Sequence, residues 1–403
     1  MPAPQIPDPE RLKIDFGLTE ADLGPRQPPQ PALMAELGLP WPPGLAPQPQ
    51  PLDVEPDVSD PLPRADVLVI TWTVAEVEAL ADVLTPGFNR NSWYRYARDF
   101  DDYLPQIRAR APARAAKRLA SYFPTRIGER DVLCVKSELH LNQDGVKTGD
   151  GTATLPVKRM IRQMIDEVRP SLVISVGTAG ATFPPDRKLT IGGLSCPPHE
   201  LGDVVITRGA KFRLSQEFKN EDFADAAFRC ESFEIPTSRL AAAKTLLAVH
   251  AEKLSEPAFG APTTKYGMPA LLPGFRNAPT LHIDGRDFPE FHPILTTDFF
   301  EFGTSTNGLE HEGCGVEMGD AVFGLAIEEM KAEGLAHVPD WLVIRNASDP
   351  QINGELPDRS NPQVPREMRR ALNMQAHWAV WYYESYGYWT SVNSAIAVWA
   401  MSA

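Results

Sequence analysis

The feature that most constrains the fold is a short apolar run that follows a helical pattern and leads into glycines. Apolar side chains recur at helical spacing over residues 156–168, and residues 172–176 read LVISV, a run suited to a strand buried on both faces. The chain then reads GTAG at residues 177–180, where we expect a tight turn at the end of the strand. A helix that leads directly into a buried strand is typical of a parallel sheet covered by helices.

The same order of patterns occurs on either side of this run. Residues 66–71 read as a buried strand and residues 75–83 as a helix, and residues 131–135 are a further strand candidate. Residues 316–330 indicate a helix and residues 341–344 a strand. We therefore expect an α/β fold with a mixed, largely parallel central sheet flanked by helices.

Residues 1–64 differ in composition from the rest of the chain. They hold 17 of the 40 prolines, and proline excludes regular helices and central strands because it lacks the amide donor and fixes φ. We expect either an extended arm that wraps the body or a partner subunit, or a disordered leader. Residues 65–403 are expected to form one domain, with a helical insertion near 86–127 and a loop-rich one near 255–290.

Charge and cysteine usage exclude several classes of protein. A net charge of -14 and a pI near 5.1 are a poor electrostatic match for a nucleic acid polymer. The four cysteines have no CxxC pair, which favours reduced thiols in a cytoplasmic protein. No signal peptide is visible at the N-terminus, and the apolar stretch 378–403 is interrupted by polar residues such as Glu384 and Asn393. We interpret that stretch as a buried helix, and we expect no membrane partner.

Histidines and aromatic residues form no obvious site. His140, like the other isolated histidines, is interpreted as a surface or core residue, and the aromatic cluster at 378–389, which includes Tyr383, as core or subunit interface. There is no HExxH motif and no clustered set of His and Cys, so we expect neither a metal nor another cofactor.

Four segments in a fixed order carry the chemistry. They are DVLVI at 66–70 leading to Glu76, SVGTAGA at 175–181 followed by GDVV at 202–205, TDFF at 297–300 followed by GVEMGDA at 315–321, and WLVIRNASD at 341–349. Together they resemble the nucleoside phosphorylase/nucleosidase superfamily, and in motif they are closest to the methylthioadenosine/S-adenosylhomocysteine nucleosidases. The resemblance implies that residues 65–403 form a nucleosidase-like catalytic domain.

The resemblance assigns roles to two acids. Asp349 matches the acid that donates a proton to N7 of a purine, and Glu76 matches the glutamate that helps to activate the attacking water. Carboxyl groups suit both tasks, because the base must leave without a full negative charge while the sugar develops a positive one.

The resemblance also implies a set of substrate contacts. The expected substrate-binding residues are Thr178, Ala179, Gly180, Phe300, Glu317, Met318, Asp320, Arg345 and Ser348. Among them, Phe300 would stack on the base, and Thr178 and Arg345 would lie near the ribose. The chain departs from the family directly after Met318: the usual ribose-binding glutamate is Gly319, so either Glu317 or Asp320 could accept the sugar hydroxyls.

The implied activity is hydrolysis of the N-glycosidic bond of a purine (adenosine-type) nucleoside or nucleotide, with release of free base and sugar. Ser175 stands where many phosphorylases place an arginine for phosphate, which favours water as the nucleophile. A phosphate-dependent phosphorylase and a non-catalytic nucleoside-binding protein stay open as alternatives. By analogy with the superfamily we expect a homo-oligomer, a dimer or a hexamer.

Overall fold

Three adjacent strands form the centre of the sheet in the computed structural model, which describes residues 23–251, 278–284, 291–358 and 373–403. These strands are β2 (Val67–Thr71), β6 (Leu172–Ala181) and β15 (Asp340–Asp349). β6 pairs in parallel with both β2 and β15, and nearly every residue of the three strands is buried. Such strands need apolar residues on both faces, which explains the continuous apolar runs in the sequence.

Further strands extend the sheet on both sides of this centre. Its main path runs in the order β1-β4-β5-β2-β6-β14-β13-β10-β11, while β15 joins β6 to β9, β9 pairs with β12, and β3 pairs with β4. The bounds are β1 (Gln48–Pro49), β3 (Tyr94–Tyr96), β4 (Ala120–Ile127), β5 (Arg130–Ser137), β9 (Val204–Thr207), β10 (Gly209–Phe212), β11 (Ala227–Arg229), β12 (Leu281–Ile283), β13 (Ile294–Thr296) and β14 (Gly315–Glu317). β7 (Leu189–Ile191) and β8 (Leu194–Cys196) form a separate ribbon. A parallel centre with antiparallel pairs around it confirms the expected mixed sheet.

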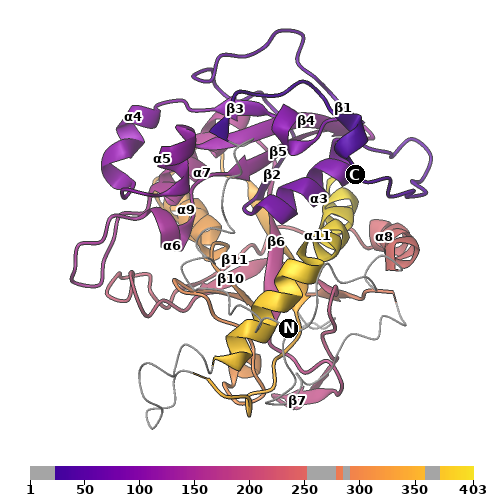
Figure 1. The fold of residues 1–403 in the computed structure, drawn as a ribbon, viewed down its shortest axis with the longest axis vertical. Helices are drawn as coiled ribbons and strands as arrows, with labels where there is room; N and C mark the ends of the chain where they lie inside the picture. The colour runs from indigo at the N-terminus through magenta and orange to yellow at the C-terminus, as the bar shows by residue number, and fades with distance from the viewer. Residues whose placement is uncertain (1–22, 252–277, 285–290, 359–372) are drawn as a thin grey trace, which may run out of the picture.

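Helices cover the sheet in two groups (Figure 1). α3 (Val74–Leu84) and α8 (Thr237–His250) pack against the long C-terminal helix α11 (Met374–Ser402), and α11 also lies on β6 and β15. α7 (Pro156–Val168) packs against α9 (Ala321–Ala332). The shorter helices are α4 (Phe100–Tyr103), α5 (Pro112–Ala116) and α6 (Leu141–Asp144). The helix expected at 156–168 is confirmed, because its apolar residues at helical spacing form the buried face of α7.

Two local expectations are wrong. The glycine segment 177–180 is not a turn, because β6 continues through it and pairs there with both β15 and β14. Small residues are needed because the segment is crowded: a Cβ at Gly177 would lie 2.5 Å from Oε1 of Glu76. The helix expected at 316–330 begins later, at Ala321, because the residues before it form β14.

Residues 23–64 of the proline-rich segment run along the body. β1 pairs with the edge strand β4, and the ring of Trp41 lies 5.1 Å from the ring of Trp399 near the C-terminus. The indole nitrogen of Trp399 donates to the carbonyl of Leu45 at 2.7 Å. Proline suits this course because it tolerates an extended backbone at the edge of a sheet.

The two expected insertions are built differently. Residues 86–127 contain short helices, as expected. They also contain β3 and β4, so this region adds strands to the sheet. Most of the region 255–290 lies outside the described residues; its described part, 278–284, contains β12.

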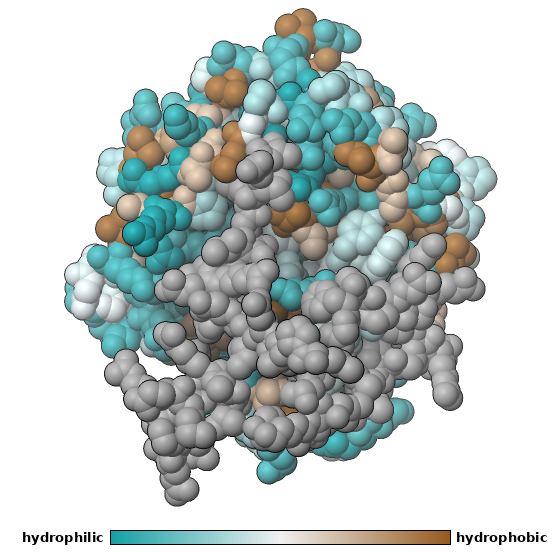
Figure 2. All heavy atoms as spheres, viewed as in Figure 1, coloured by the Kyte–Doolittle hydropathy of each residue, from teal (hydrophilic) through white to brown (hydrophobic). Residues whose placement is uncertain are grey.

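The surface and the interior separate as in a globular domain. On the face shown in Figure 2, hydrophilic residues cover most of the described upper part, with hydrophobic residues scattered among them. All four cysteines are buried and none is in a disulfide. α11 is largely buried, as expected for the C-terminal stretch. Among the described helices, none combines the length and the apolar character needed to span a membrane.

Candidate active site

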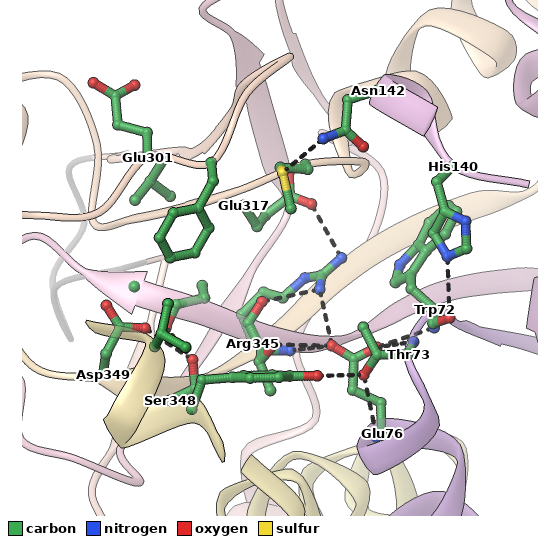
Figure 3. Close-up of a pocket in the computed structure, with 18 of the residues that line it drawn as sticks. Trp72, Thr73, Glu76, His140, Asn142, Glu301, Glu317, Arg345, Ser348 and Asp349 are labelled. Atoms are coloured by element: carbon green, nitrogen blue, oxygen red, sulfur yellow. Dashed lines mark hydrogen bonds and ion pairs between the residues drawn. The ribbon is translucent and has the colours of Figure 1, made fainter. Parts of the chain in front are cut away.

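A pocket opens where the central strands end at their carboxyl ends, the usual place for ligands in open α/β sheets. β2, β5, β6, β14 and β15 or the residues that follow them contribute to its wall, and α11 closes one side. The lining residues are Trp72, Thr73, Glu76, His140, Asn142, Thr178, Ala179, Gly180, Phe300, Glu301, Val316, Glu317, Met318, Arg345, Ser348, Asp349, Val380, Tyr383 and Glu384. In Figure 3, Ser348 and Asp349 lie at one end, Glu76 and Trp72 at the other, and Arg345 between them.

An irregularity in β15 brings two polar side chains to one end of the pocket. Ala347 pairs with Ala179 and Asp349 pairs with Gly180, which leaves Ser348 as an extra residue in the strand. In a regular strand, successive side chains point to opposite faces, whereas a bulge redirects them. Both Ser348 and Asp349 therefore line the pocket.

Asp349 is a buried acid of the pocket that, within the described part of the chain, lacks a hydrogen-bond partner on one of its oxygens. Its side chain is buried, Oδ1 accepts a hydrogen bond from the Ser348 hydroxyl at 3.0 Å, and Oδ2 has no hydrogen-bond partner among the described residues. Burial raises its pKa to about 7, against the smaller opposing effect of the Ser348 hydroxyl. A substantial fraction of this carboxyl is therefore protonated near neutral pH, and the residue lines the cavity.

Glu76 lies at the opposite end, and its position follows from local sequence. Thr73 caps α3 and Glu76 stands three residues later, so the two residues form a capping box. Oε2 accepts hydrogen bonds from the backbone N–H groups of Thr73 at 2.8 Å and Trp72 at 3.0 Å. Oε1 accepts from both the backbone N–H and the hydroxyl of Thr178, at 2.8 and 2.9 Å. The helix start thereby fixes the carboxylate against β6.

Arg345 lies at the centre of a buried group of acids. Its Nε and Nη2 donate to the two carboxylate oxygens of Asp320 at 2.8 and 2.6 Å, a paired geometry typical of strong arginine–carboxylate contacts. Nη2 also donates to Glu317 at 3.2 Å, and Nη1 lies 3.8 Å from Oε1 of Glu76. Burial alone would lower the pKa of Arg345, but its acidic neighbours together raise it, so the guanidinium stays charged.

Three carboxyl groups around one guanidinium leave an excess of potential negative charge. Burial, and then the charge of Asp320, raise the pKa of Glu317 to about 8 despite the opposing effect of Arg345. Glu317 accepts hydrogen bonds from the Thr296 hydroxyl and from the backbone N–H of Asp320. A protonated Glu317 lowers the electrostatic cost of burying this cluster at neutral pH.

The structure brings nearly all the expected site residues together. Ten of the eleven line the pocket, and they come from segments separated by more than 270 residues. Asp320 does not line it: its side chain is fully buried beneath Arg345 and binds that residue and Ser175. Phe300 lies at the rim, with 37% of its surface exposed.

Several lining residues were not anticipated. The Thr73-x-x-Glu76 spacing is a visible capping signal, and it could have identified Thr73. His140 was interpreted as a surface or core residue, but it lines the pocket, because it follows the parallel strand β5. Tyr383 was assigned to core or interface, yet it also lines the pocket and bonds to the Thr73 hydroxyl at 3.0 Å. Only the packing of α11 across the sheet could place Tyr383 there.

Comparisons with known proteins give distant structural likenesses. No family model and no curated protein matches the chain. Among solved structures, the chain is similar to 5′-methylthioadenosine/S-adenosylhomocysteine nucleosidase from Neisseria meningitidis in complex with methylthio-immucillin-A, with 14% identity and a TM-score of 0.39 over 83% of this chain and 97% of that one. A putative nucleosidase of the same kind from Borrelia burgdorferi, bound to adenine, has 12% identity and a TM-score of 0.42 over 83% and 98%.

Futalosine hydrolase from Helicobacter pylori is similar at 9% identity and a TM-score of 0.37, over 83% of this chain and 96% of that one. Because the likenesses are this distant, the function has to be inferred from the side chains of the pocket.

Proposed function

We propose that this protein hydrolyses the N-glycosidic bond of a purine nucleoside, with Asp349 as the general acid and Glu76 beside the sugar. In this reaction the bond between the base and the anomeric carbon breaks, and its electron pair leaves with the base. The base takes the Asp349 proton, and a water oxygen bonds to the anomeric carbon. The products are free base and free sugar.

The state of Asp349 is the observation that carries this proposal. A general acid works best when its pKa is near the operating pH, and burial raises the pKa of Asp349 to about 7. Its Oδ2 is buried and has no hydrogen-bond partner among the described residues, and Asp349 lines the pocket, so we infer that a ring nitrogen of the base supplies the missing partner. Phe300 also lines the pocket and offers an aromatic face that can stack on the base.

The opposite end suits a sugar that develops positive charge. Glu76 and the cluster around Arg345 supply negative charge there. The oxygens of Glu76 are already engaged by backbone N–H groups and by the hydroxyls of Thr71 and Thr178. Thr71 is fully buried, whereas Thr178 lines the pocket, where its hydroxyl can rotate away. We infer that a water takes the place of this hydroxyl on Oε1 and gives Glu76 its proton as it attacks.

Water fits this pocket better than phosphate as the nucleophile. Arg345 is the one lysine or arginine among the described lining residues, and its donors are committed to acids and to the Thr178 carbonyl. Ser175 is buried and donates to Asp320 at 2.6 Å, so it too is committed. None of the arginines of residues 86–127 lines the pocket.

The same charges favour a nucleoside over a nucleotide. The lining includes five acids, Glu76, Glu301, Glu317, Asp349 and Glu384, and one guanidinium, that of Arg345. Arg213, which does not line the pocket, pairs with Glu301. Even with Glu317 and Asp349 partly protonated, a 5′-phosphate would meet negative potential without a free cation to pair with. An uncharged 5′ substituent avoids this repulsion.

The test is chromatographic analysis of products from a panel of purine nucleosides and their 5′-monophosphates, with and without inorganic phosphate. We expect free base and free sugar from nucleosides, at a rate that added phosphate does not change. Formation of a sugar 1-phosphate would replace this proposal with a phosphorylase. Thermal stabilisation by nucleosides without any base release would indicate a binding protein.

Asp349→Asn removes the proton donor while keeping size and polarity. We expect base release to fall by roughly 10²–10⁴-fold. Asp186→Asn, a change at an exposed acid outside the pocket, is the matched control and should leave the rate unchanged. Equal rates in the two variants would remove Asp349 from the mechanism.

A further inference from the structure

The indole of Trp72 lines the sugar end of the pocket beside the carboxylate of Glu76. A Cβ built on Gly319 would lie 3.3 to 3.5 Å from three carbons of the Trp72 ring, so the ring rests against the Gly319 backbone. A methyl group at position 319 would already be in tight contact with the ring, so a longer side chain would crowd it. Gly319 and Trp72 therefore fit together, because the missing side chain at position 319 makes room for the indole ring.

Trp72 is held firmly in this position. It is 5% exposed, and its Nε1 donates to the Ser175 hydroxyl at 3.2 Å. Its ring makes an edge-on contact with Phe323, with centroids 5.8 Å apart, and its carbonyl contacts Nε2 of His140 at 3.2 Å. Because both the polar and the apolar parts of the indole are fixed, the ring is a constant part of the pocket wall.

The acids near this wall have little capacity left for sugar hydroxyls. Both oxygens of Asp320 bind Arg345, and Asp320 lies beneath the lining. Glu317 receives hydrogen bonds on both of its oxygens, from Thr296, Asp320 and Arg345. Glu76 accepts from two hydroxyls: that of Thr71, which is buried outside the pocket lining, and that of Thr178, whose place the proposed mechanism gives to the attacking water.

We propose that Trp72, seated over Gly319, makes the pocket selective for purine nucleosides whose sugar lacks the 2′-hydroxyl. This inference rests on the proposed function, which places the base at Asp349 and the sugar at Trp72. A 2′-hydroxyl pressed against the indole would lose its water without gaining a hydrogen bond, whereas a 2′-methylene makes an apolar contact with the ring. The discrimination is of the modest size that an apolar wall gives against an added hydroxyl.

The experiment compares adenosine with 2′-deoxyadenosine, both as substrates and as ligands. We expect the deoxynucleoside to have a dissociation constant roughly 10-fold lower, measured by calorimetry on Asp349→Asn, which should bind without turnover. In the wild-type protein, kcat/KM for 2′-deoxyadenosine should exceed kcat/KM for adenosine by at least the same factor. Binding is measured separately because deoxyribosides also have the more labile glycosidic bond.

Three variants assign the preference to Trp72, each placed in the Asp349→Asn background for binding. Trp72→Phe keeps an aromatic wall and loses the hydrogen bond to Ser175, and it should retain the preference. Trp72→Ala should reduce the ratio of the two dissociation constants to near one. The double variant Trp72→Ala/Gly319→Glu has room for a carboxylate, and it should bind adenosine more tightly than 2′-deoxyadenosine. Thermal unfolding and circular dichroism establish that each variant is folded.

The outcomes separate this inference from the proposed function. Equal or tighter binding of adenosine by the protein with Trp72 intact overturns the selectivity, even if purine nucleosides are hydrolysed. A preference for the deoxynucleoside that survives in Trp72→Ala also overturns it, because the wall would not be its source. Tighter binding of 2′-deoxyadenosine without base release from any nucleoside supports the selectivity and refutes the hydrolase. Binding of neither nucleoside overturns the selectivity, while the product analysis over the full panel still decides the hydrolase.

Discussion

The free oxygen of Asp349 lies directly over the backbone of Gly180. A Cβ at position 180 would lie 2.9 Å from Oδ2 of Asp349 and 3.4 Å from a methyl carbon of Val316. The absence of a side chain on β6 therefore leaves the space into which the carboxyl of β15 extends. This contact joins the second and the fourth sequence motifs in one wall of the pocket.

Gly180→Ala tests that relationship. The backbone at this position can accept alanine, so the added methyl group should act mainly by pushing the Asp349 carboxyl out of place. We expect kcat to fall by about 10-fold or more, with a smaller change in KM, because a displacement of about 1 Å is enough to spoil proton transfer. Steady-state kinetics alongside a melting curve would check this. A variant with wild-type kcat would show that the close contact is irrelevant to the chemistry.

The pH dependence of the reaction should follow Asp349. Its pKa is raised from 3.8 to about 7, so the carboxyl is protonated at pH 6 and largely ionised at pH 8. A general acid must hold its proton, and we therefore expect kcat/KM to fall as the pH rises through about 7. Glu317, with a pKa raised to about 8, titrates nearby, so the assignment requires Asp349→Asn. If the residual activity of that variant shows the same falling limb, another group is responsible.

The same pKa shift has a consequence for stability. The folded state binds this proton more tightly than the unfolded state, so the stabilisation is complete below pH 3.8 and is lost as the pH rises through about 7. Asp349→Asn removes this loss. We therefore expect the Tm of Asp349→Asn minus the Tm of the wild-type protein to be larger at pH 8 than at pH 5, by roughly 2 °C or more. A Tm difference that does not vary with pH would contradict the raised pKa.

Glu76→Gln tests the acid at the sugar end against a neighbour on the same helix. The glutamine amide would place a donor among the backbone and hydroxyl donors that now bind the carboxylate, and it would also remove the negative charge. We expect a loss of activity of at least about 100-fold and a lower Tm. Glu78→Gln alters an acid that is 46% exposed and pairs with Arg90 outside the pocket, so it should behave as wild type. Similar activity in the two variants would exclude a role for Glu76 in the reaction.

Phe300→Ala tests aromatic stacking at the base end. Phe300 is 37% exposed, so its truncation removes little buried surface and should leave the Tm nearly unchanged. Loss of a stacking face should raise KM roughly 10-fold, with a smaller effect on kcat. Leu335→Ala removes a similarly exposed apolar side chain outside the pocket and is the control. An unchanged KM would place the base elsewhere.

The order of the central elements could be determined from sequence alone. Continuous apolar runs predicted β2 and β6, and apolar spacing predicted α3 and α7, because burial imposes a distinct periodicity on each kind of element. The resemblance of four segments to the nucleosidases implied that Glu76 and Asp349 serve one site, and both line the same pocket. The pocket lies at the carboxyl ends of the parallel strands, where ligands of open α/β sheets bind.

Tertiary structure decided what each of these side chains contacts. The bulge at Ser348 depends on how β15 pairs with β6, and the continuation of β6 through its glycines depends on β14 and β15 lying on either side. Trp72 opposite Gly319, Tyr383 from α11, and the burial of Asp320 under Arg345 are contacts between segments far apart in the chain. Such contacts follow from packing of whole elements, which leaves no local periodic signal in the sequence.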